Sequence, residues 1–381
     1  MKIVDVCGFY AAAGGGVRRY VDAKFAAAER TGHRLTVIAP GAQTQFEERA
    51  GGEVAWVASP PMPFDPRYRR FGARAAVWAA IEAAAPDVLE ASSPWTSASI
   101  VATWTGRAKR SLVFHQDVVA AYAHTTLDGV LGRRAIDSLC APWWSRIRRL
   151  SRRFDVTVAG GEWLAKRLSD HGVANVVAVP FGIEAGRFKP GQRDEGLRAE
   201  LLAKCGLGPE AKLLLAVSRF HPEKRLPAVI AAASQARRRR PDLGLAIVGE
   251  GLAEAAVKRA AAKAGGVALL GAVGNREALA RIYASADLFV HGSAAETYGL
   301  AVAEAIASGL TVVAPAGGGA GDLARSGYSM LYRPGDAADG ARAILEALAG
   351  RADAPSAPSP GTLDEHFAAL CALYERLAPP L

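Results

Sequence analysis

Residues 287–305 read DLFVHGSAAETYGLAVAEA, and this stretch indicates both a fold class and a candidate site. A short apolar strand is expected at 287–291, a polar turn with Glu296 follows it, and an Ala-rich helix contains Glu304. A buried strand running through a turn into a helix is typical of α/β proteins. If the helix begins near Tyr298, the free amides of Tyr298, Gly299 and Leu300 would face the strand end, where an anion or a sugar hydroxyl could bind.

The two acids of this stretch form a pair with seven residues between them, Glu296 in the turn and Glu304 about one and a half turns into the helix. Carboxylates accept hydrogen bonds from vicinal hydroxyls, so the pair could hold two parts of one polyhydroxylated ligand. The alternative is a helix-capping acid followed by a solvated helix acid, and the pair alone leaves both interpretations open.

The same strand-and-helix alternation extends in both directions along the chain and predicts parallel sheets with crossover helices. Expected strands lie at 2–6, 34–39, 54–58, 86–90, 111–114, 155–159 and 175–179, and then at 212–217, 243–248, 267–270, 287–291 and 310–314. Expected helices of the second series lie at 224–239, 252–264, 276–284 and 299–308. We therefore predict two doubly wound, Rossmann-like α/β domains facing each other across a cleft, with functional residues at the carboxyl ends of strands.

Chain length and composition agree with this division. A chain of 381 residues with 50% hydrophobic and 22% charged residues is long enough for two folded domains. We place them at 1–182 and 183–353, followed by a Pro-rich linker and a final helix within 354–381 that could pack back on the first domain. No signal peptide or membrane-spanning stretch is recognisable, and four scattered cysteines suit a reducing cytoplasm. No metal-ligand spacing is present, so we expect no metal site.

A basic pair follows the expected strand at 212–217, where the chain continues as SRFHPEKR. Arg219 and Lys224 would flank a turn at a strand end, where two cations could neutralise a diphosphate. Solvated surface is the alternative for such a pair.

Two further signals lie in the N-terminal half. Gly15 and Gly16 end a glycine triplet between the first strand and a helix, where a backbone can approach a phosphate or sugar closely. The triplet is not the Gly-x-Gly-x-x-Gly fingerprint, which argues against a nicotinamide cofactor. His115 directly follows the expected strand at 111–114. It could belong to a polar cluster at a cleft between the domains, or it could be a buried, hydrogen-bonded core histidine.

These motifs, in this order, resemble the retaining GT-B glycosyltransferases of the glycogen-synthase-like and mannosyltransferase-like group, glycosyltransferase family 4 or "group 1". The resemblance spans nearly the whole chain and includes the glycine triplet, PFGIE at 180–184, the basic pair, the VGEG turn at 248–251, and ETYGL followed by Glu304-Ala305. It implies a metal-independent enzyme that moves a hexose from a UDP- or GDP-sugar to a cell-envelope lipid or saccharide. No cofactor beyond the nucleotide-sugar donor is implied.

The resemblance also implies residue roles. An acceptor-binding N-terminal domain and a donor-binding C-terminal domain are expected. Arg219 and Lys224 would bind the donor diphosphate, Glu304 the ribose hydroxyls and Glu296 the transferred hexose. The remaining expected contacts are His115 near the sugar, and Gly15, Gly16, Gly249, Gly251, Tyr298, Gly299 and Leu300 along the donor.

Three residues depart from the family pattern. Ser218 and Arg225 stand where glycine is common, and Glu250 occupies the middle of the Gly-x-Gly turn. These departures bear on the pocket for the base more than on the chemistry.

The net charge of +9 includes a cluster of seven arginines between Arg133 and Arg153, in a predicted helical region with Trp143 and Trp144. One interpretation is contact with an anionic membrane surface, and the other is a helix with solvated arginines and core-packed tryptophans. We expect a cytoplasmic protein, with attachment to the inner face of the membrane as an open alternative.

Two rival functions remain at this point: a non-hydrolysing sugar-nucleotide epimerase of the same architecture, and a basic nucleic-acid-binding protein. No nucleic-acid-binding motif is present, so we expect no nucleic-acid partner.

Overall fold

The computed structural model describes residues 1–11, 16–63, 68–127, 130–325, 329–350 and 360–378. They form two compact units. The first consists of Met1–His115, Asp137–Pro180 and Leu363–Leu381, and the second of Gln116–Ile136 and Phe181–Thr362. Residues Gln116–Ile136 therefore group with the second unit, although the boundary predicted at residue 182 places them in the first domain.

The first unit is built on a sheet in the order β3-β4-β2-β1-β5-β6-β7-β8. Its strands are β1 (Lys2–Val6), β2 (Arg34–Gly41), β3 (Gln45–Arg49), β4 (Gly52–Ala58), β5 (Val88–Ala91), β6 (Lys109–Phe114), β7 (Val156–Ala159) and β8 (Val176–Ala178). Neighbours pair in parallel except β3 with β4. The antiparallel edge strand β3 was not predicted, because its sequence QFEER is polar and mostly exposed.

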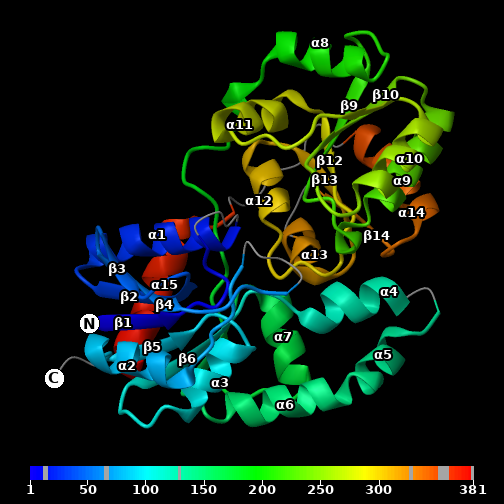
Figure 1. The fold of residues 1–381 in the computed structure, drawn as a ribbon. Coiled ribbons are helices and arrows are strands. Elements are labelled where there is room, and N and C mark those ends of the chain that lie inside the picture. The colour runs from blue at the N-terminus through cyan, green and yellow to red at the C-terminus, as the bar shows by residue number, and fades with distance from the viewer. Residues whose placement is uncertain (12–15, 64–67, 128–129, 326–328, 351–359, 379–381) are drawn as a thin grey trace. The chain divides into compact units, whose positions relative to one another are not determined.

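Helices cover this sheet, so its central strands are buried along nearly their whole length. They are α1 (Gly16–Thr31), α2 (Arg74–Ala84), α3 (Thr96–Thr103), α6 (Ala141–Ser151) and α7 (Glu162–Asp170). The final helix α15 (Leu363–Leu377), red in Figure 1, also belongs to this unit. Its Phe367, Leu370 and Tyr374 are buried in the core with strand residues such as Val37 and Val113.

The second unit has a parallel sheet in the order β11-β10-β9-β12-β13-β14. Its strands are β9 (Lys212–Val217), β10 (Leu243–Val248), β11 (Val267–Leu269), β12 (Leu288–Val290), β13 (Thr311–Pro315) and β14 (Ser329–Tyr332). Its helices are α8 (Glu195–Lys204), α9 (Leu226–Arg239), α10 (Glu254–Ala264), α11 (Arg276–Ser285), α12 (Leu300–Ala307), α13 (Gly318–Arg325) and α14 (Ala337–Leu348). The order reverses between β9 and β12, which is the position where ligands bind in doubly wound sheets.

Short helical segments complete the described chain. They are the π-helix η1 (Val119–His124), α4 (Thr125–Leu127), α5 (Arg133–Leu139), and the 3-10 turns η2 (Pro190–Gln192) and η3 (Pro222–Lys224). The predicted linker at 354–360 falls almost entirely outside the described residues.

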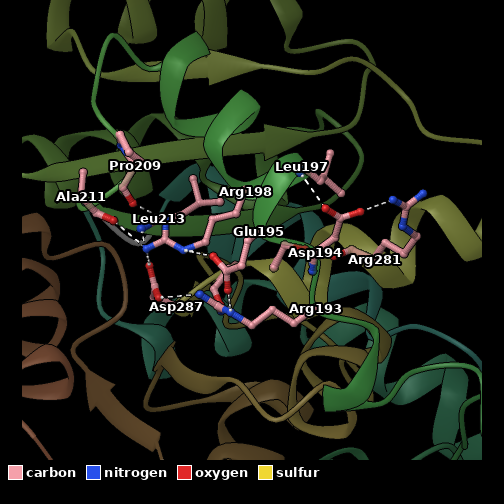
Figure 2. A network of polar contacts seen from close by, with 12 residues as sticks. Arg193, Asp194, Glu195, Leu197, Arg198, Pro209, Ala211, Leu213, Arg281 and Asp287 are labelled. Carbon is pink, nitrogen blue, oxygen red and sulfur yellow. Dashed lines mark hydrogen bonds and ion pairs between the residues drawn. The ribbon is translucent and has the colours of Figure 1, made fainter.

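A polar network fixes the starts of the two central strands of the second unit (Figure 2). Arg198 of α8 donates to Asp287 at 2.8 Å and to the backbone oxygen of Ala211 at 2.6 Å. The same Asp287 carboxylate accepts from the backbone amide of Leu213 at 2.7 Å. Because the guanidinium is buried and every contact is charge-assisted, the register of β9 against β12 is held firmly, and so are the loops that leave their other ends.

Candidate active site

The site of the second unit forms where β9 and β12 end. These strands are parallel neighbours, with Leu214 beside Leu288 and Leu215 beside Phe289, so their carboxyl ends lie next to each other. The turn with Arg219 and Lys224 follows β9, and residues 292–299, which we name the acidic loop, follow β12. Both motifs therefore lie at the carboxyl ends of strands, as predicted.

Lys224 and Glu296 form the centre of this site. The Nζ atom of Lys224 lies 2.7 Å from Oε1 of Glu296 and 3.2 Å from Oε1 of Glu223. Burial by itself would lower the pKa of Lys224, but the two carboxylates outweigh burial and raise it. Lys224 is thus a fixed positive charge, not a solvated surface residue.

Glu296 is held in its ionised form. Burial alone would raise the pKa of Glu296, but the charge of Lys224 and the nearby His291 imidazole hold it well below its ordinary value. Its side chain is 20% exposed, so one edge of the carboxylate still reaches solvent. A carboxylate that stays ionised is a strong acceptor for ligand hydroxyl groups.

Arg219 lies beside this pair but is far more accessible. Its side chain is 77% exposed, and its Nη2 atom lies 3.7 Å from Oε1 of the buried Glu223. Glu223 also accepts from Nε2 of Gln116 at 3.3 Å. The sequence analysis missed Glu223, although it directly precedes Lys224 and its carboxylate forms ion pairs with both cations.

Glu304 lies on α12 and is buried. Its Oε1 atom accepts from Nη2 of Arg276 at 2.7 Å, and its Oε2 atom accepts from the hydroxyl of Tyr283 at 2.9 Å. The alternative of a solvated helix acid is therefore wrong. The two donors, both on α11, fix the direction of the carboxylate, and each oxygen keeps a further lone pair for a ligand.

The helix after the acidic loop begins later than predicted. Tyr298 is buried, Gly299 adopts a left-handed conformation with φ of 97°, and α12 starts at the half-exposed Leu300. Gly299 thus serves as the residue before the helix, because a side chain is strained at this φ. The first helical amides come from Leu300 onward and not from Tyr298.

Glycines allow two other segments to approach the site. Gly249 has φ of 139°, and a Cβ atom there would come 1.8 Å from the backbone oxygen of Ser218, so the turn after β10 packs directly on the chain leaving β9. Gly251 is similarly close to Phe220. On the other side, the amide of Gly319 donates to the backbone oxygen of Glu296 at 2.7 Å. That last contact, from α13, was not predicted.

The N-terminal candidates belong to the first unit. His115 directly follows β6, and its ring packs against that of Tyr20 in a T-shaped arrangement with a centroid distance of 5.0 Å. Burial lowers the pKa of His115 to about 4, so the ring is neutral at physiological pH. Gly16 is the exposed first residue of α1, and Gly15 lies outside the described residues.

A buried charged network that the sequence analysis did not predict crosses the core of the first unit. Nζ of Lys24 lies 2.9 Å from Asp5 and 2.6 Å from Glu90. The hydroxyl of Tyr374 donates to the other oxygen of Glu90 at 2.5 Å. Each oxygen of Glu90 therefore has a partner, and the network connects α1, β1, β5 and α15.

The Arg-rich region consists of α5 and α6 and the residues that follow, not of one helix. Trp144 is buried and stacks on His171 at a centroid distance of 3.8 Å, while Trp143 contacts Trp95. The tryptophans are therefore packed against protein. The exposed residues of this region include Leu139 and four of its arginines, Arg134, Arg149, Arg152 and Arg153.

With this geometry established, comparison with known proteins gives the family. The description Glycosyltransferase Family 4 matches residues 14–187, and Glycosyl transferases group 1 matches residues 198–358. A GDP-mannose-dependent alpha-mannosyltransferase of Mycolicibacterium smegmatis is 32% identical over 314 residues, or 77% of this chain and 74% of that protein. The chain belongs to the group 1, family 4 glycosyltransferases.

Two further known proteins are similar to this glycosyltransferase over most of its length. A GDP-mannose-dependent alpha-(1-6)-phosphatidylinositol dimannoside mannosyltransferase of Mycobacterium tuberculosis is 29% identical over 320 residues, covering 82% of this chain and 79% of that protein. The solved structure of sucrose-phosphate synthase from Thermosynechococcus elongatus has a TM-score of 0.72 at 19% identity, covering 99% of this chain and 96% of that one. This likeness confirms the predicted GT-B fold with two Rossmann-like domains.

No helix among the described residues of this glycosyltransferase is long and apolar enough to cross a membrane.

Proposed function

We propose that this glycosyltransferase transfers mannose from GDP-mannose to a glycolipid or saccharide of the cell envelope, with retention of the anomeric configuration and without a metal ion. The observation that carries the proposal is the convergence of Lys224, Glu296 and Arg219 at the ends of β9 and β12. It combines two cations for a diphosphate with an ionised carboxylate for a sugar.

The choice of GDP-mannose comes from the relatives. Both the Mycolicibacterium and the Mycobacterium relatives are GDP-mannose-dependent, and they cover most of this chain. UDP-glucose was an equal candidate from the sequence, and the relatives favour GDP-mannose over it. The second relative acts on a phosphatidylinositol dimannoside, which supports a glycolipid acceptor here. Family membership likewise favours transfer over epimerisation or nucleic-acid binding.

In the proposed reaction Arg219 and Lys224 bind the diphosphate, and their charges stabilise it as it leaves. This is the role that a metal ion has in other enzymes, and two cations, the mostly buried Lys224 and the accessible Arg219, can supply it. Glu304, directed by Arg276 and Tyr283, accepts from the ribose hydroxyls. We propose that the turn at Gly249 and Gly251 adjoins the base.

Glu296 has a binding role in this proposal and is not a nucleophile. Its Oε1 atom is engaged by Lys224 at 2.7 Å, which lowers its nucleophilicity and fixes its orientation toward sugar hydroxyls. Retention then proceeds by attack of the acceptor on the face from which the diphosphate leaves. The departing phosphate takes the acceptor proton, so atoms and charge balance without a covalent enzyme intermediate.

The first unit is proposed to bind the acceptor, and the roles carried over for Gly15, Gly16 and His115 belong to this same proposal. Contact with an anionic membrane is proposed through the exposed arginines at 134, 149, 152 and 153 and not through the tryptophans. Such contact would bring a cytoplasmic enzyme to a lipid acceptor.

The proposal is tested by incubating the purified protein with GDP-mannose, EDTA and vesicles that contain phosphatidylinositol dimannoside. We expect release of GDP and, by NMR, a new mannosyl group in the α configuration of the donor. Glu296→Gln should reduce transfer by about 100-fold or more, because the sugar loses an ionised acceptor. A β-linked product would contradict retention, and transfer that requires an added divalent metal would contradict the metal-free mechanism.

A further inference from the structure

His291 is a buried histidine directly before the acidic loop, and the proposed reaction gives this histidine no role. It directly follows β12 and is 4% exposed. Its backbone amide donates to the oxygen of Val313 at 2.8 Å, and its backbone oxygen accepts from the hydroxyl of Tyr332 at 2.7 Å. Residues of β13 and β14 thus fix the backbone of His291, and with it the point from which the imidazole side chain projects.

The residue after it explains why His291 and Lys224 reach the same carboxylate. A Cβ atom on Gly292 would lie 2.5 Å from the backbone oxygen of Lys224 and 2.8 Å from Cγ2 of Val229. The chain leaving β12 therefore packs directly against the turn that carries Lys224. Only glycine permits this approach without a shift of backbone.

The imidazole faces Glu296. Nε2 of His291 lies 3.4 Å from Oε1 of Glu296, the same oxygen that Lys224 contacts at 2.7 Å. Within the described part of the chain this buried nitrogen has no partner with full hydrogen-bond geometry. A buried polar atom without such a partner requires an explanation, and catalytic contacts are often loose until the substrate is bound.

We propose that His291 is a positioning residue that, together with Lys224, holds Oε1 of Glu296 so that Oε2 is presented to the transferred hexose. The inference rests on the function proposed above. Oε2 has no hydrogen-bond partner among the described residues, while the Glu296 side chain is 20% exposed. Donor binding would shorten the His291–Glu296 contact into a hydrogen bond donated by Nε2–H.

The test compares His291→Phe, which keeps an aromatic ring without a donor, with His291→Gln, which restores an N–H at similar reach. GDP is the discriminating probe because it lacks the hexose. In His291→Phe we expect kcat/KM for GDP-mannose to fall by about tenfold or more while the Kd of GDP stays within about twofold. His291→Gln should recover most of the lost kcat/KM.

His171→Phe is the matched control, because it makes the same exchange in a histidine that stacks on Trp144 and belongs to the first unit. It should leave both constants unchanged. Equal losses of GDP affinity and of transfer in His291→Phe, or no recovery in His291→Gln, would reduce His291 to a packing role and overturn the inference. A wild-type protein that transfers no sugar would instead overturn the proposed function itself, so the two failures are distinguishable.

Discussion

Two histidines of the first unit should make it sensitive to mild acid. Burial lowers the pKa of His115 to about 4 and that of His366 to about 4, against 6.5 for an exposed histidine. The hydroxyl of Tyr20 lies 2.9 Å from Nε2 of His366, and the Nδ1 atom lies 2.9 Å from the backbone oxygen of Pro180. Both nitrogens are thus occupied when the ring is neutral, with Nδ1–H donating and Nε2 accepting.

The expected magnitude follows from linkage. The unfolded chain binds these two protons near pH 6.5 and the folded chain only near pH 4, so stability is fully present above 6.5 and is lost as the pH falls towards 4. Each histidine shift corresponds to about 3 kcal/mol over its full titration range. Asp5 opposes this loss, because burial raises its pKa to about 6. Glu90 adds to the loss, because Lys24 outweighs burial and lowers the pKa of Glu90. The net loss between about pH 7 and pH 4 is therefore on the order of a few kcal/mol.

Tryptophan fluorescence is a suitable assay because all seven tryptophans, at positions 56, 78, 95, 104, 143, 144 and 163, lie in the first unit. Urea unfolding of this unit should show the free energy of unfolding decreasing by roughly a few kcal/mol between about pH 7 and pH 4. In His366→Gln one of the two histidine contributions is absent, so the loss of stability between about pH 7 and pH 4 should be clearly smaller than in the wild type, by up to about 3 kcal/mol. A variant whose stability falls with pH as steeply as that of the wild type would refute the reasoning.

Three further changes test other contacts. Tyr283→Phe removes a hydrogen bond to Glu304 and should raise the KM for the donor several-fold, at a stability cost of about 1 kcal/mol measured by denaturant unfolding. Gly319→Ala would place a methyl group 2.4 Å from a backbone oxygen of the acidic loop, and kcat/KM should fall by about tenfold or more in a transfer assay. Tyr374→Phe leaves one oxygen of Glu90 without its donor and should destabilise the first unit by about 1–3 kcal/mol, as followed by tryptophan fluorescence. An unchanged KM, an unchanged kcat/KM or an unchanged unfolding midpoint would contradict the respective contact.

Much of the second unit could be predicted from the sequence because its strands are short apolar runs and its motifs follow them directly. Parallel pairing places the ends of β9 and β12 at one edge, so the proximity of Lys224 and Glu296 follows from topology alone. The exposure of Arg219 and the burial of Glu304 do not follow, because they depend on how α11 and η3 pack.

The remaining contacts are made by residues far apart in the chain. Gln116 reaches Glu223, and Tyr374 reaches Glu90, across more than a hundred residues in each case. Lys24 reads from the sequence as one more charge on an amphipathic helix, yet it is buried between two carboxylates. Such pairs leave no periodic signal, and only the folded chain shows them.

The central claim is that the pair at the end of β9 binds a nucleoside diphosphate, and isothermal titration of GDP into wild-type protein and Arg219→Ala in the presence of EDTA tests it most directly. Arg219 is 77% exposed, so its removal should leave the fold intact. We predict metal-independent binding of GDP to the wild type and at least about tenfold weaker binding to the variant, the loss expected for one charge-assisted phosphate contact. Equal affinity in the two proteins, or no binding of GDP to the wild type, would contradict the claim.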